Sequence, residues 1–151
     1  MARIKVGDIF EITTPEGKAY LHYIHKDSVT GELVRVLQDL YSERPKDLNE
    51  IVTLKERYMV SFPLSAAARK KIVESVGHYS ASNFSKPKFM RTEHRVRGEF
   101  LGWHLVDTET WHRQLVKTLS PEQKKLSPWG IWNDTFLIEN LVNGWSLESW
   151  G

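Results

Sequence analysis

The first forty residues alternate between β-prone segments and tight turns, and this pattern limits the fold more than any other feature of the sequence. Thr14–Gly17 and Thr30-Gly31 have turn chemistry, because Pro15 fixes φ and glycine accepts a positive φ. The segments between them are rich in β-branched, aromatic and aliphatic residues, with a bend expected at Gly7-Asp8. The predicted strands are Ile4–Ile12, Ala19–His25 and Leu33–Leu37. Strands at this spacing predict an antiparallel meander.

The rest of the chain mixes helical and strand patterns. Capping residues and fourfold apolar spacing predict helices over Leu48–Val52, Ala66–Val76, from Ser120 onward, and over Thr135–Asn143 with Asp134 as its cap. Further strands are predicted over Tyr58–Phe62 and Leu101–Asp107, and a long loop over residues 78–99. Residues 109–118 are ambiguous between strand and helix, although their alternation favours a strand. The predicted class is α+β, in one domain over residues 1–151. It has a small bent antiparallel sheet or partial barrel on the N-terminal side and three to four flanking helices.

Composition indicates a soluble protein of the reducing cytoplasm. The chain has 151 residues and no cysteine, which excludes disulfides and thiolate metal sites. No apolar run approaches the length that a signal peptide or a membrane helix needs. We therefore expect a cytoplasmic protein without membrane contact.

Charge is distributed unevenly along the chain. Residues 61–100 carry 8 Lys and Arg against 3 Asp and Glu, a balance of +5, whereas the whole chain is only +2. Several cations in this segment alternate with aromatic residues. The candidates for nucleic-acid binding are Lys86, Lys88, Phe89, Arg91, Arg95 and Arg97.

No motif for catalysis, a metal or a cofactor is present. The only close histidine pair, His22 and His25, would point to opposite faces of a strand. The chain has no Gly-x-Ser-x-Gly, no glycine-rich phosphate loop and no cysteine nucleophile. We therefore predict no enzyme activity, no metal and no cofactor.

Aromatic residues point instead to binding. Four of the six tryptophans lie in the last quarter of the chain, and Trp129 and Trp132 flank Gly130 in a predicted turn. Tryptophan is usually well buried, but in an exposed turn it is a common anchor of protein interfaces. Acidic residues near the N-terminus could meet a basic partner. The candidate partner-binding residues are Glu32, Asp39, Glu43, Trp129 and Trp132.

Several short segments, taken in order, resemble the Immunity protein 26 family of bacterial polymorphic-toxin systems. They are Ile4–Ile12, Pro15–Tyr20, Tyr41-Ser42-Glu43 with Asp47–Ile51, Pro87-Lys88-Phe89, Gly102-Trp103 and Asn143-Gly144-Trp145. The resemblance implies a β-rich intracellular protein that neutralises a cognate toxin, or another conflict-system protein, by direct contact. It transfers no binding residues. A nucleic-acid-binding module built on residues 79–97 is the alternative interpretation.

Overall fold

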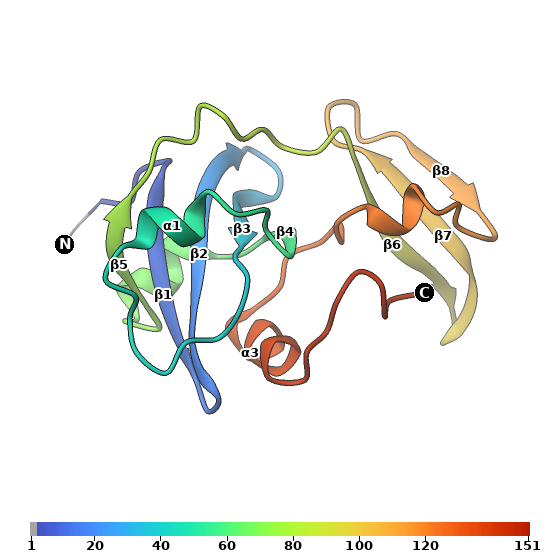
Figure 1. Ribbon diagram of the computed structural model, residues 1–151. Coiled ribbons are helices and arrows are strands. Elements are labelled where there is room, and N and C mark those ends of the chain that lie inside the picture. The colour runs from blue at the N-terminus through green and yellow to red at the C-terminus, as the bar shows by residue number, and fades with distance from the viewer. Residues whose placement is uncertain (1–2) are drawn as a thin grey trace.

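The computed structural model describes residues 3–151, which form two antiparallel sheets side by side (Figure 1). The first sheet has the order β4-β3-β2-β1-β5 and the second has the order β6-β7-β8. The strands are β1 (Asp8–Thr14), β2 (Gly17–Asp27), β3 (Gly31–Val36), β4 (Tyr58–Ser61), β5 (Val73–His78), β6 (Phe89–Val96), β7 (Glu99–Asp107) and β8 (Arg113–Val116). The helices are α1 (Leu48–Val52), α2 (Leu64–Arg69) and α3 (Asp134–Val142), with a 3₁₀ turn, η1, over Gln123–Lys125. The predicted α+β class and its N-terminal meander are confirmed, and the first sheet remains open.

The first sheet is buried on both faces. Successive residues of a strand point to opposite faces, so a strand such as β1 contributes side chains to both buried clusters. Phe10 and Ile12 of β1 pack in a cluster with Trp132 and with Leu137 of α3. Ile9 of the same strand packs on the other face, against residues of α1. Helices therefore cover both sides of the meander, with α3 on one face and α1 on the other (Figure 1).

One short segment joins the two sheets. Pro128 makes a parallel bridge to Arg91 of β6, and Ile131 makes a parallel bridge to Ser61 of β4. The same stretch of backbone therefore runs along the edge of both sheets. A small buried cluster lies beside it, in which Ile24 and Leu33 of the first sheet meet Met90 of the second.

A buried arginine organises the α1 side of the first sheet. Arg35 on β3 donates to the carbonyls of Val52 and Leu54, pairs with Glu56 at 2.8 Å, and lies 3.8 Å from the centre of the Phe84 ring. It also donates to Nδ1 of His22 at 3.0 Å. Because arginine can only donate, the His22 proton sits on Nε2, which donates to the carbonyl of Tyr79. Burial, together with the nearby Arg35 charge, holds the pKa of His22 below its usual value.

The predicted helix over Ala66–Val76 is wrong beyond residue 69. The chain leaves the helix through Lys71, whose φ is 60°, and then forms β5 along the edge of β1. The apolar residues at fourfold spacing fit a helix equally well, but pairing with β1 also satisfies the backbone hydrogen-bonding groups of this edge. Gly77 is thus a strand residue and not a helix stop.

The predicted loop over residues 78–99 is also wrong in its second half, where β6 pairs with β7. Strands over residues 58–61 and 99–107 are confirmed, and β8 occupies the centre of the ambiguous stretch 109–118. The helix expected from Ser120 is only a single 3₁₀ turn, with Ser120 and Gln123 capping each other. The last helix is capped by Asn133 and not by Asp134.

None of the helices described between residues 3 and 151 has the length and apolar character needed to cross a bilayer.

Glu11 on β1 provides a test of how the loop after β3 is held. Its buried carboxylate accepts from Arg44, Lys18 and Tyr20, and the Arg44 hydrogen bonds lower its pKa to about 2, against the opposing effect of burial. A lowered pKa stabilises the fold above the unfolded value of 4.5, and this contribution is lost as the pH falls toward 2. We expect Glu11→Gln to cost about 2 kcal/mol at neutral pH. Urea unfolding should show that cost shrinking between pH 5 and pH 2, whereas exposed Glu16→Gln should change little at any pH. A cost that does not vary with pH would contradict the assignment.

Candidate functional site

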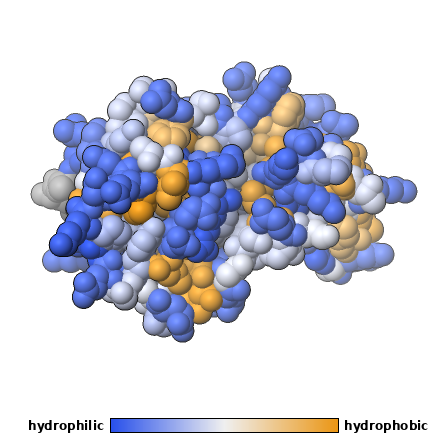
Figure 2. Space-filling model, in the orientation of Figure 1, coloured by the Kyte–Doolittle hydropathy of each residue, from blue (hydrophilic) through white to orange (hydrophobic). Residues whose placement is uncertain are grey.

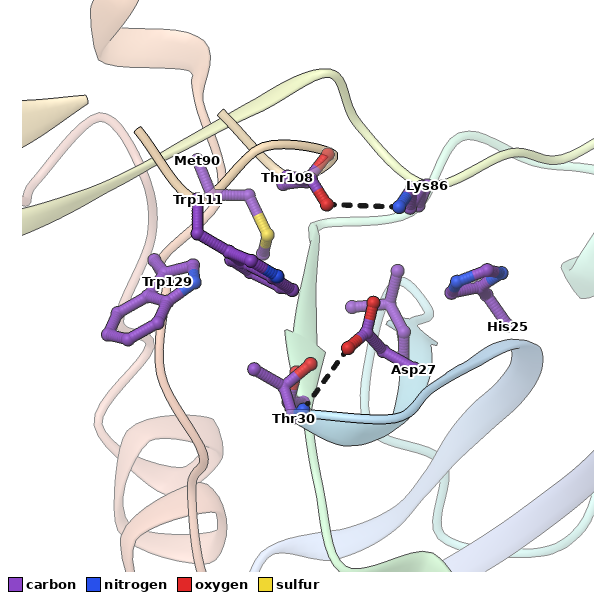
Figure 3. Close-up of a pocket in the computed structure, with 10 residues that line it drawn as sticks. His25, Asp27, Thr30, Lys86, Met90, Thr108, Trp111 and Trp129 are labelled. Atoms are coloured by element: carbon purple, nitrogen blue, oxygen red, sulfur yellow. Dashed lines mark hydrogen bonds between the residues drawn. The ribbon is translucent and has the colours of Figure 1, made fainter. Parts of the chain in front are cut away.

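Two hollows in the described structure are lined by residues that the sequence suggested for binding. The first, which we call the seam crevice, lies between the two sheets (Figure 3). One wall comes from the end of the β2–β3 hairpin and β4, and the other from the second sheet and its loops. The wall from the first sheet is formed by His25, Asp27, Thr30, Leu33 and Ser61, and the opposite wall by Lys86, Met90, Thr108, Trp111 and Trp129.

The size of the seam crevice limits what it can hold. Its cavity volume is ≈ 20 Å³, which is room for about one water molecule. Binding pockets for small molecules are usually several hundred Å³. The seam crevice is therefore too small to enclose an ordinary small-molecule ligand.

Trp111 has an unusual backbone at the rim of this crevice. Its φ is 63°, a left-handed conformation that a bulky side chain rarely adopts. The preceding turn holds it there, because Asp107 Oδ1 accepts from the N–H groups of Glu109 and Thr110, and Trp111 N–H donates to the Asp107 carbonyl. This turn directs the indole toward Trp129, with ring centres 6.4 Å apart.

Trp129 is held by the segment that joins the sheets. Its N–H donates to the carbonyl of Arg91, and the guanidinium of Arg113 lies 4.5 Å from the centre of its ring. Its indole Nε1 is buried without a hydrogen-bond partner among residues 3–151. Both tryptophans are nevertheless partly exposed, so their rings combine a fixed position with accessible surface.

The second hollow is the basic cleft, which lies at the far end of the second sheet and has a volume of ≈ 440 Å³. Arg95, Lys117 and Lys124 supply three positive charges and Glu93 supplies one negative charge. Phe100 and Trp103 form its apolar floor. Gly102 allows the strands to approach here: its φ is 144°, and a Cβ would lie 2.7 Å from the carbonyl oxygen of Val116.

Arg91 lies behind the floor of the basic cleft and is fully buried. Its guanidinium donates to the carbonyls of Lys124, Leu126, Leu147 and Trp150. The rings of Trp103 and Trp150 pack on it at 4.7 and 4.1 Å. Burial lowers the pKa of Arg91 to about 10, so the group stays protonated at neutral pH.

The predicted acidic partner-binding residues do not form one surface. Glu32 lies at the start of β3 and accepts from the N–H and hydroxyl of Ser65, where the fold uses it to hold α2. These hydrogen bonds outweigh the effect of burial and lower the pKa of Glu32. Asp39 and Glu43 are exposed but lie beyond the other end of β3, about 20 Å of extended chain from Glu32.

Trp132 is not at the surface, contrary to prediction. Only 9% of it is exposed, because it packs against Tyr58, Phe136 and Trp145 in the core of the first sheet. Trp129 does lie at the surface, on the rim of the seam crevice. The exposed turn expected around Gly130 is instead the segment paired with both sheets.

The predicted basic segment is dispersed by the fold. Lys86 donates to the carbonyl of Thr108 in the seam, and buried Arg91 is unavailable to a ligand. Lys88 lies 5.6 Å from the ring of Phe89, and Arg97 is exposed at the β6–β7 turn with a φ of 51°. Of this set, Arg95 lines the basic cleft.

Several residues of both hollows were missed by sequence reasoning. Trp111 lies in the turn between β7 and β8, and the sequence gives no sign that its φ is positive. Lys117 and Lys124 come from segments on either side of Ser120 and meet only in the folded chain. The sequence did contain one indication of the basic cleft. Trp103 lies in the predicted strand Leu101–Asp107 and Phe100 directly precedes it, so a contact between the two rings could be expected.

The histidines do not form a metal centre in the described residues 3–151, where no cluster of three or more metal-binding side chains occurs. His94 and His104 do stack on adjacent strands with ring centres 4.5 Å apart. Burial, and then the charges of His94 and Arg113, lower the pKa of His104. Arg113 also lies 3.4 Å from its Nδ1, so a cation beside this pair would be repelled.

Comparisons of the chain with protein-family models, with curated proteins and with solved structures found no match.

Arg91 can be tested as the support of the basic cleft. The planar guanidinium of Arg91 donates to four carbonyls and stacks on two rings, and a lysine ammonium cannot make all of these contacts. Arg91→Lys therefore leaves buried carbonyls without partners. We expect a loss of about 3 kcal/mol in urea unfolding and faster hydrogen exchange in residues 145–151. Exposed Arg97→Lys should stay within about 0.5 kcal/mol of wild type. Equal stability of the two variants would rule out this role for Arg91.

The strain at Trp111 makes a distinct prediction. Glycine normally destabilises relative to alanine, but at a φ of 63° alanine pays the left-handed penalty that glycine avoids. Trp111→Gly should therefore be more stable than Trp111→Ala by about 1 kcal/mol in thermal or urea unfolding. At Trp129, which is not among the residues with positive φ, the order should be reversed. Alanine being the more stable replacement at both positions would contradict the strained geometry.

Proposed function

We propose that the protein is a non-catalytic binding protein that recognises another protein, and that the partner docks on the rim of the seam crevice. The observation that carries the proposal is the convergence of Trp111 and Trp129, two partly exposed indoles at the junction of the sheets. Tryptophan is enriched among the residues that dominate protein interfaces.

The cost of holding Trp111 supports a functional interpretation. A bulky residue in the left-handed region costs about 1–3 kcal/mol, and such strain is concentrated at binding and catalytic sites. The side chain and carbonyl of Asp107 hold this strained conformation through hydrogen bonds from the backbone of Glu109, Thr110 and Trp111. The ring is thus pre-positioned, which reduces the entropy lost when a partner binds.

The remaining features of the rim fit a protein partner better than a small molecule. The cavity holds about one water, so contact must occur mainly on its outer surface. Lys86, Asp27 and His25 line the same crevice on the side away from Trp129 (Figure 3), and they supply polar groups like those in the rim of an interface. Apolar side chains gather only in small separate patches on the face shown in Figure 2. A limited aromatic anchor suits that surface.

The resemblance to the Immunity protein 26 family suggests which class of partner binds. By this proposal, the partner is a cognate toxin or another conflict-system protein, and binding in the cytoplasm neutralises it. The exposed carboxylates of Asp39 and Glu43, distant from the seam, would add long-range attraction to a basic partner without direct contact.

The proposal is tested with tagged wild-type protein and folded variants, used to capture partners from nuclease-treated host lysate. Wild type should retain one stoichiometric protein, and Trp111→Gly combined with Trp129→Leu should weaken its reconstituted complex by at least about 2 kcal/mol in calorimetry. Leu54→Ala removes an apolar side chain near α1 that is more exposed than either tryptophan, and it should bind as wild type.

One further double variant separates the acidic end from the seam. Asp39→Lys with Glu43→Lys should slow association at low salt and leave dissociation unchanged. A partner that binds the tryptophan double variant with unchanged affinity would exclude the seam crevice, and loss only in the acidic variant would move the interface to the opposite end of β3.

A further inference from the structure

We propose that the basic cleft is a second binding site, separate from the seam crevice, which takes a nucleotide phosphate with its base stacked on Phe100. The ligand class is a phosphate-bearing nucleotide, either free or as a unit of single-stranded nucleic acid. This inference does not depend on the protein partner, because it rests on different residues.

The charge of the basic cleft favours an anion. Neither Lys117 nor Lys124 belongs to an ion pair within residues 3–151. Glu93 is the one opposing carboxylate among its lining side chains, and it is paired with Arg95 at 3.1 Å. Two lysines are therefore free to contact phosphate oxygens, and Thr118 adds a hydroxyl donor to the lining.

A buried charge reinforces this field from behind. Arg91 has carbonyls and aromatic rings around it, and no carboxylate bonds to it. Its positive charge is therefore not neutralised by an ion pair, and it lies directly under Trp103 of the cleft floor. A charge in a low-dielectric region acts over longer distance than the same charge in water, so Arg91 adds to the attraction for an anion.

The floor of the basic cleft supplies a stacking surface. Phe100 is 40% exposed, and its ring packs edge to face on buried Trp103, with centres 5.5 Å apart. Arg95 covers part of the ring, with its guanidinium 5.5 Å from the ring centre. An exposed aromatic ring beside free cations is the arrangement by which proteins bind single strands without reading their sequence. The volume of ≈ 440 Å³ accommodates one nucleotide unit.

This site differs from the basic segment that the sequence suggested. Of the predicted segment, Arg91 supports the floor from within and Arg95 lines the cleft. The two lysines of the cleft come from segments after residue 116. A peptide rich in carboxylates would match the charges but would leave the exposed Phe100 ring without a planar partner. The combination of charge and ring therefore favours a nucleotide over an acidic peptide.

The test is fluorescence anisotropy of a labelled twelve-nucleotide oligothymidylate with the full chain at about 50 and about 300 mM salt. We expect saturable binding that weakens with salt. Lys117→Glu with Lys124→Glu should lower affinity by at least about tenfold, and the double alanine variant should reduce the salt slope by about 1.4 for two phosphate contacts. The charge-matched control is Lys46→Glu with Lys70→Glu, which should bind as wild type. Both lysines are exposed and lie beside the first sheet, Lys46 in the loop before α1 and Lys70 at the end of α2.

Phe100→Leu isolates stacking from charge. It keeps apolar contact with Trp103, so the fold should be retained by circular dichroism. Oligothymidylate affinity should fall at least about fivefold, while competition by inorganic phosphate stays unchanged. If thymidine monophosphate competes as well as the oligonucleotide at the same concentration of nucleotide units, the site is assigned to a free nucleotide. Competition only by the longer strand would assign it to nucleic acid, and both results support the proposal.

Three results would overturn it. The first is no saturable binding at about 50 mM salt. The second is an equal loss in the Lys117/Lys124 and Lys46/Lys70 variants, which would show general charge attraction. The third is polyglutamate competing as well as the oligonucleotide with no effect of Phe100→Leu, which would make the cleft a site for acidic peptides.

Discussion

The guanidinium of Arg91 fixes the C-terminal segments to the second sheet, and the basic cleft depends on that contact. A small sheet is stable only when one of its faces packs against apolar side chains or another element. Here the fold places a buried cation on the edge strand β6 and directs carbonyls from η1 and from residues 147–150 toward it. Charge-assisted hydrogen bonds to these carbonyls are stronger than neutral ones, and the two indoles fill the remaining space.

Arg35 performs a similar role in the first sheet. It donates hydrogen bonds to carbonyls at the end of α1 and just after it, and it pairs with Glu56. It also stacks on Phe84, which belongs to the connection between the sheets. A guanidinium has a fixed, planar set of donors, so it accepts only one arrangement of the surrounding loops. Two buried arginines thus order irregular segments that have too few apolar residues to form a core.

The range of each interaction decides how much could be predicted from the sequence. Strands β1 to β3 follow from local alternation and turn residues, and Trp129 and Arg95 were identified as binding candidates from their types and neighbours. Strand β6 was missed because its charged residues suggest solvent, and the burial of Arg91 depends on carbonyls more than thirty residues away. Lys117 and Lys124 both line the basic cleft, and the hydrogen bond from Arg91 to the Lys124 carbonyl helps to hold η1 there. No local pattern contains that information.

Strand β6 also explains how the two candidate sites can coexist. Successive strand residues point to opposite faces, so Met90 lies in the seam crevice while Arg91 lies under the floor of the basic cleft. The alternation of apolar and charged residues along this one strand therefore supplies both sites. Coupling between sites requires an element with two arrangements that both ligands bias. A sheet held by Arg91 on one face and by the seam cluster on the other favours a single arrangement, which leaves each face free to bind its ligand without excluding the other.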